Sequence, residues 1–164
     1  MNTHKRHEGF SLIELLIVVA IIGIIAAIAI PNLLASKRAA NEASAIASLR
    51  TLTGAQATYH ATKGGGEYGT LANLMGEGLI DTVLGTSPFL KGGYIFGMTP
   101  LASSSTAAPR YDATATPQSF SVLGATGSRS FYSNESGVIY FNTTGTAPTC
   151  DPATRVVSSG SPLK

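Results

Sequence analysis

The sequence has few of the residues that catalysis, metal binding or cross-linking require. It contains one cysteine, Cys150, so no disulfide can form within the chain and no cysteine cluster can hold a metal ion. Of its three histidines, His4 and His7 lie within the first nine residues, and only His60 lies beyond them. No Gly-x-Ser-x-Gly motif marks a nucleophilic serine. We therefore expect no enzyme active site, no metal and no cofactor.

Charged residues are also scarce, at 12% of the chain, and they are scattered singly beyond residue 9. The formal net charge is +2, and it falls to +1 if residues 1–9 are removed with Lys5, Arg6 and Glu8. A protein that binds nucleic acid electrostatically needs a clustered basic face. The charge pattern therefore predicts no specific nucleic-acid partner.

Apolar residues are concentrated near the N-terminus, where Leu15 to Ile30 form an unbroken run of sixteen. As a helix, residues 10–30 would be about 31 Å long, which matches a bilayer core of about 30 Å. Lys5 and Arg6 precede the run, and cations before an apolar segment favour insertion with that end in the cytoplasm. The segment is therefore a candidate single membrane span.

Three interpretations of this segment compete. A secretory signal peptide would be cut after the small-x-small triplet Ala27-Ile28-Ala29, so that Ile30 becomes the first residue. A plain membrane anchor would keep the whole segment. Neither interpretation explains Glu14, since an ionised carboxylate near the apolar core costs roughly 2–4 kcal/mol. The third interpretation is a specifically processed N-terminus.

The segment Gly9-Phe10-Ser11-Leu12-Ile13-Glu14 resembles the type III signal of type IV pilins and type II secretion pseudopilins. In that family a prepilin peptidase cuts after the glycine, and the new amine is N-methylated. The resemblance implies cleavage after Gly9, methylation of Phe10 and Glu14 as the fifth mature residue. Because a buried charge is far less costly when paired, we expect Glu14 to meet the amine of a neighbouring subunit and fix the register between them.

The likeness extends downstream to short bacterial type IV pilin-like proteins, through segments 41–46, 49–51, 93–96 and 131–139. The chain departs from many type IVa pilins because it lacks the cysteine pair that closes a C-terminal loop. A major pseudopilin would be expected to carry a calcium-binding loop near its C-terminus. Asp112, Glu135 and Asp151 are too dispersed along the sequence to predict one.

Helical features continue beyond the apolar run. Pro31 removes one helix hydrogen bond and Gly23 weakens the helix, so we expect a kink, and local loss of helix between them in an assembled fibre. Residues 32–62 are alanine-rich, and we expect their buried face to be formed by Ala39, Ala43, Ile46, Leu49, Thr53 and Ala57, with Asn41, Glu42 and the basic residues on the opposite face. A short helix capped by Thr70 should follow the glycines at 64–66.

The remainder predicts an antiparallel sheet. Strand-like runs occupy 93–98 and 119–123, and the runs 130–132 and 138–141 flank a turn-rich stretch and predict a hairpin. The Ser/Thr/Ala/Pro-rich stretch 101–117 suggests an exposed loop. The fold prediction is α+β, a long kinked N-terminal helix packed on a small sheet of three to four strands.

The predicted organisation has five parts. They are a leader (1–9), a transmembrane and assembly helix (10–30), an amphipathic upper helix (31–62), a globular α+β head (63–142) and a loose C-terminal tail (143–164). The resemblance implies a structural subunit of a type IV pilus-like filament, or alternatively the major pseudopilin of a type II secretion system. Its partners would be copies of itself, prepilin peptidase, membrane lipid before assembly, and the inner-membrane assembly platform with its ATPase. It would span the inner membrane once, and then enter an extracellular pilus or a periplasmic pseudopilus.

Overall fold

The computed structural model describes residues 9–120 and 124–163, so residues 1–8 of the predicted leader (1–9) lie outside the described residues. The chain divides into two compact units, one up to Ser36 and one from Lys37 onward. Helix α1 (Leu12–Thr62) supplies residues to both units. In the first unit α1 contains Gly23 and Pro31 and is assigned as helix without interruption. The predicted kink and the predicted loss of helix in a fibre stay predictions.

Two short helices follow α1 in the second unit, α2 (Leu71–Gly76) and α3 (Thr82–Gly85). Thr70 caps α2 as predicted, because its hydroxyl accepts from the Asn73 N–H while the Asn73 side chain accepts from the Thr70 N–H. Asp81 caps α3 through a hydrogen bond from the Leu84 N–H at 2.8 Å. Both helices therefore begin at residues whose side chains satisfy otherwise unpaired amides.

The main sheet is antiparallel and has the strand order β1-β2-β3-β4-β5-β8. Its longer members are β2 (Tyr94–Leu101), β3 (Arg110–Pro117), β4 (Ser130–Asn134) and β5 (Ile139–Asn142), and its edges are the two-residue strands β1 (Leu90–Lys91) and β8 (Ser161–Pro162). Two further short strands, β6 (Thr149–Cys150) and β7 (Val157–Ser158), pair with each other. The α+β class and the hairpin formed by β4 and β5 are confirmed, and the edge strands extend the sheet beyond the predicted three to four.

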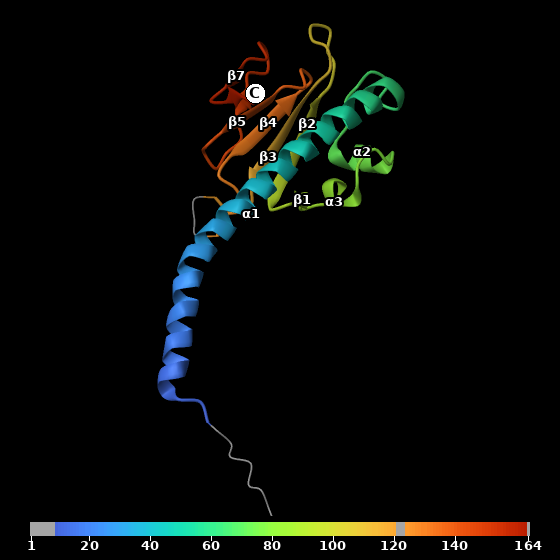
Figure 1. Cartoon of the computed structure of the whole chain (residues 1–164). Coiled ribbons are helices and arrows are strands. Elements are labelled where there is room, and N and C mark those ends of the chain that lie inside the picture. The colour runs from blue at the N-terminus through green and yellow to red at the C-terminus, as the bar shows by residue number, and fades with distance from the viewer. Residues whose placement is uncertain (1–8, 121–123, 164) are drawn as a thin grey trace, which may run out of the picture. The chain divides into compact units, whose positions relative to one another are not determined.

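Within the second unit, the part of α1 from Lys37 onward lies across one face of this sheet (Figure 1). The core between them is apolar and contains Ala45, Leu49 and Leu52 from α1, together with Tyr94, Phe96, Tyr111, Ala113, Ala115 and Phe131 from the sheet. Leu71, Leu74 and Leu84 from the short helices complete it. Burial of these side chains is what fixes α1 to the sheet.

The predicted buried face of α1 was partly wrong. Leu49 is fully buried, but Ala39, Ala43 and Ala57 are exposed. The buried face instead consists of Glu42, Ala45, Ser48, Leu49, Leu52, Ala55 and Gln56. Periodicity of apolar residues missed this face because three of its members are polar. Two of them, Glu42 and Gln56, are hydrogen-bonded to loops whose positions the sequence pattern does not predict.

Glu42, predicted on the outer face of the helix, is 5% exposed. Its carboxylate accepts from the Ser128 N–H at 2.8 Å, from the Ser128 hydroxyl at 2.7 Å and from Arg129 Nε at 2.8 Å. Burial raises the pKa of the Glu42 carboxyl, but the hydrogen bonds from Ser128 and the charge of Arg129 outweigh it and hold that pKa below its ordinary value. Glu42 is therefore a charged anchor between α1 and the segment that leads into β4.

Three other expectations from the sequence, two about strands and one about the C-terminal segment, differ from the structure. Residues 110–117 were predicted to lie in an exposed loop but form β3, whose alternate residues are buried, including Ala113 and Ala115. The alternation was overlooked because its inward residues are mostly small. The strand predicted at 119–123 is absent at Ser119 and Phe120, and residues 121–123 lie outside the described residues.

The segment from Thr143 was predicted to be a loose tail, yet β6, β7 and β8 lie within it. The Leu163 N–H donates to the Ile139 carbonyl oxygen at 2.8 Å, next to the pairing of β8 with β5. Backbone pairing with an existing strand needs no large apolar side chains. The shortage of such side chains therefore did not predict a lack of structure.

Candidate functional site

The candidate site is the start of α1 and the apolar helix that follows. Gly9, Phe10 and Ser11 precede the helix and are exposed, and the Phe10 side chain is 91% exposed. The peptide bond between Gly9 and Phe10 thus lies outside regular secondary structure. A protease needs an extended, accessible segment at the bond that it cuts, and this geometry is compatible with cleavage there.

Glu14 has a partner within the chain that the sequence reasoning missed. Its carboxylate accepts from the Ser11 N–H at 2.9 Å, while the Ser11 hydroxyl accepts from the Ile13 N–H at 3.3 Å. Ser11 and Glu14 follow the S-x-x-E pattern of a capping box, which satisfies free amides at a helix start and places a negative charge at the positive end of the helix dipole. The S-x-x-E pattern can be seen in the sequence, and it gives Glu14 a local role as part of the helix cap.

The helix beyond Glu14 presents apolar side chains on every side. Fifteen large apolar side chains from Phe10 to Leu33 are exposed in the chain by itself. An 18-residue window of α1 has a mean hydropathy of 3.1 and none of it is buried, so this helix is long and apolar enough to cross a membrane. Since burying one such side chain is worth about 1.5–3 kcal/mol, the segment requires lipid or other helices around it.

Gly23 and Pro31 interrupt this apolar surface. A Cβ atom added to Gly23 would meet no atom within 4 Å in this chain. Pro31 has no backbone N–H and so donates no backbone hydrogen bond. Next to it, the side-chain amide of Asn32 donates to the carbonyl oxygen of Ile28, one helical turn earlier, at 3.1 Å. The predicted roles of Gly23 and Pro31 as kink positions therefore stay predictions.

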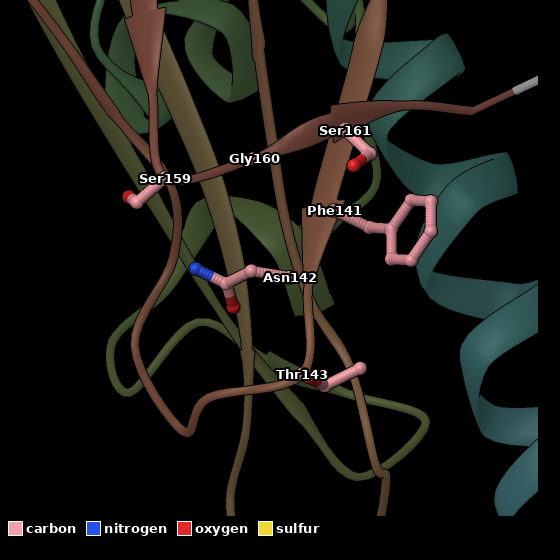
Figure 2. Close-up of a pocket in the computed structure, with 6 residues that line it drawn as sticks. All are labelled: Phe141, Asn142, Thr143, Ser159, Gly160 and Ser161. Carbon is pink, nitrogen blue, oxygen red and sulfur yellow. The ribbon is translucent and has the colours of Figure 1, made fainter.

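An open depression lies on the second compact unit, the unit from Lys37 onward, which is called the head from here on. Figure 2 shows an open depression between the end of β5 and β8, where Phe141 points toward α1 and the Asn142 amide points the opposite way. Its lining residues are Phe141, Asn142, Thr143, Ser159, Gly160 and Ser161, none of which ionises near neutral pH. The described residues contain no group of three or more histidine, cysteine or acidic side chains able to hold a metal ion. The depression therefore contributes no side chain that could act as a general acid or base near neutral pH.

The chain is similar to known proteins over part of its length. Residues 4–30 match the family described as the prokaryotic N-terminal methylation motif. The type IV major pilin protein PilA of Myxococcus xanthus is 45% identical over 73 residues, which cover 44% of this chain and 32% of that protein. The type IV wide pilus major component PilA4 of Thermus thermophilus is 52% identical over 55 residues, which cover 34% of this chain and 42% of that protein.

A second kind of relative matches over a similar length. The type II secretion system core protein G of Klebsiella pneumoniae is 34% identical over 55 residues, which cover 34% of this chain and 39% of that protein. The chain thus spans less than half of the length of these three relatives. No solved structure matches it significantly. The family match accordingly covers residues 4–30, and most of the chain has to be interpreted from its own residues.

Proposed function

We propose that this type IV pilin-like chain is a structural subunit of a type IV pilus-like extracellular filament, and that it assembles through its N-terminal helix. The observation that carries the proposal is the methylation motif at residues 4–30, which coincides with a helix exposed and apolar on all sides. The three relatives are named as pilus components or as a secretion-system core protein, and none of these names describes an enzyme.

In this proposal prepilin peptidase cuts between Gly9 and Phe10, and the new amine of Phe10 is N-methylated. Cleavage places a cationic amine at Phe10, four residues before Glu14, which is the first acidic side chain of the helix. In a bundle of parallel helices with staggered starts, the Glu14 carboxylate of one subunit pairs with the Phe10 amine of another. A subunit in the wrong register would leave both charges unpaired.

The capping contact of Glu14 fits the same scheme. One carboxylate accepts several hydrogen bonds, so Glu14 can accept from the Ser11 N–H and also from an amine. The contact with its own helix orients the carboxylate at the start of α1 before assembly. We infer that Glu14 is held ready by its own helix and gains its charged partner only in the filament.

Location follows from the energetics of the apolar helix. At about 25 cal/mol per Å² of apolar area, lipid or a helix bundle stabilises this segment by tens of kcal/mol relative to water. The subunit therefore spans the inner membrane once before assembly and passes directly into the filament. That transfer requires an inner-membrane assembly platform with its ATPase. In the filament we expect α1 to lose helical structure between Gly23 and Pro31.

The matches to core protein G favour a second candidate, the major pseudopilin of a type II secretion system. Such a subunit would form a short periplasmic fibre. Long fibres that contain this chain and are shed from cells support the pilus, whereas secretion lost on deletion of the chain, without surface fibres, supports the pseudopilus.

The mass of the mature chain tests the proposed processing, and with it the filament proposal, most directly. A chain that begins at Phe10 and carries one methyl group supports prepilin processing. A chain that begins at Ile30 indicates an ordinary signal peptide, and one that retains Met1 indicates a simple anchor. Either of these last two masses overturns the filament proposal.

A further inference from the structure

One side chain in the head gathers oxygen atoms from three separate places. Arg155 Nη2 lies 2.6 Å from Glu135 Oε2 and 3.0 Å from Asp112 Oδ1, and it donates to the Tyr111 carbonyl oxygen at 3.1 Å. Arg155 Nε donates to Glu135 Oε1 at 2.8 Å, so the guanidinium holds both oxygens of that carboxylate. The Arg155 side chain is only 17% exposed. Two acids that are 23 residues apart in the sequence therefore share one half-buried cation.

The partners belong to different elements. Tyr111 and Asp112 lie on β3, Glu135 follows the last residue of β4, and Arg155 lies in the loop between β6 and β7. The Tyr132 hydroxyl on β4 donates to Asp112 Oδ1 at 2.6 Å, which holds that carboxylate in place from its other side. One arginine thus connects the C-terminal segment to the centre of the sheet.

The loop that carries Arg155 is shaped for this contact. The Asp151 carboxylate accepts from the N–H groups of Ala153 and Thr154 at 2.9 and 2.7 Å, and the Arg155 N–H donates to the Asp151 carbonyl oxygen at 2.9 Å. Arg155 has φ of 58°, in the left-handed region that non-glycine residues rarely adopt. A residue held there needs strong side-chain contacts to compensate, and the paired carboxylates provide them.

We propose that Arg155 is the clasp that closes the C-terminal segment 149–158 onto the sheet, in place of a disulfide. Cys150 is the one cysteine of the chain, so a covalent closure within the chain is excluded. A planar guanidinium binds a carboxylate through two parallel hydrogen bonds, and a lysine ammonium cannot reproduce this geometry. The closure consequently resists reducing agents and depends on the identity of residue 155.

The same oxygens are of the kind that calcium takes as ligands, namely carboxylates and a backbone carbonyl. In this chain they converge on a fixed internal cation. The clasp therefore needs no divalent metal. This inference is separate from the filament proposal, since it concerns the head alone. It can hold or fail regardless of how the N-terminus is processed.

Cys150 provides the readout because its half-buried thiol lies in the closed segment. In the full chain in detergent, we measure the rate at which iodoacetamide alkylates Cys150 in the wild type, R155K, R155Q and the matched control R50Q. Arg50 is exposed on α1. Loss of the bidentate contact should raise the alkylation rate roughly tenfold in R155Q, less in R155K and not in R50Q.

Two further arms keep the proposal falsifiable if R155Q folds poorly. Millimolar guanidinium ion should slow alkylation of Cys150 in R155A by refilling the site, and the double variant D112N/E135Q should open the segment with Arg155 intact. Wild-type alkylation rates in R155Q, or closure of the wild-type segment that requires calcium and is lost with a chelator, would overturn the proposal.

Discussion

The side chain of Gln56 is bonded twice to the backbone of Gly69. Its Nε2 donates to the Gly69 carbonyl oxygen at 2.6 Å, and its Oε1 accepts from the Gly69 N–H at 3.0 Å. Gln56 is fully buried on α1, and Gly69 immediately precedes the cap of α2. One amide side chain therefore satisfies both backbone groups at the point where the chain returns to the helix that it has just left.

Replacing Gln56 with leucine should lower the free energy of unfolding of the head by about 2–4 kcal/mol, because two buried backbone groups lose their partners. The other glutamine, Gln118, is exposed, and Q118L serves as the matched control with little effect. Urea unfolding of the full chain in detergent, followed by tyrosine fluorescence, measures both. Equal midpoints for the two variants would show that the contact to Gly69 contributes nothing.

The Glu42 anchor predicts a loss of stability in acid. The pKa of its carboxyl lies below the ordinary value of 4.5, so its contribution is fully present above that value and is lost as the pH falls through the lower folded-state pKa. E42Q should be less stable than the wild type at pH 7 by about 1–3 kcal/mol and should show a weaker decline in acid. E77Q, at a more exposed acid, should retain the wild-type pH profile. A decline in E42Q as steep as in the wild type would contradict the assignment.

Two glycines in the short helices should respond in opposite ways to alanine. A Cβ atom at Gly85 would collide with the Met75 side chain, whereas one at Gly76 would meet nothing within 4 Å. We expect G85A to destabilise the head by about 1–3 kcal/mol through overpacking. G76A should be neutral or stabilising by up to about 1 kcal/mol because alanine restricts the unfolded chain. Thermal unfolding of the two variants distinguishes packing from backbone freedom.

Variants of Glu14 separate its two roles. Glutamine can serve as the third residue of a capping box but carries no charge, whereas alanine removes both functions. If the charge sets the register, E14Q and E14A should each reduce the fibre yield at least tenfold, although both are processed at Gly9. S11A, which removes only the capping hydroxyl, should still give fibres. Normal fibres from E14Q together with few from E14A would reduce Glu14 to a helix cap. Fibre mass in sheared fractions and the mass of the mature chain provide the measurements.

The sequence by itself determined the features that depend on local order along the chain. Three such features are the apolar run after Glu14, the Thr70 cap of α2 and the hairpin of β4 and β5. Each of them depends on residues that lie close together in the sequence. The segment from Gly9 to Glu14 likewise lies within residues 4–30, which match the methylation motif. Short-range signals of this kind are legible because hydrophobic periodicity, capping and turns each involve near neighbours.

Only the tertiary structure decided which polar residues are buried and what they bind. Glu42 meets Ser128 and Arg129, Gln56 meets Gly69, and Arg155 joins Asp112 to Glu135. From residue type alone, each of these three side chains would be predicted to be solvent-exposed. A charged or amide group is buried only where hydrogen-bond or ionic partners compensate the cost of removing it from water. Those partners come from distant segments that the folding of the sheet brings together.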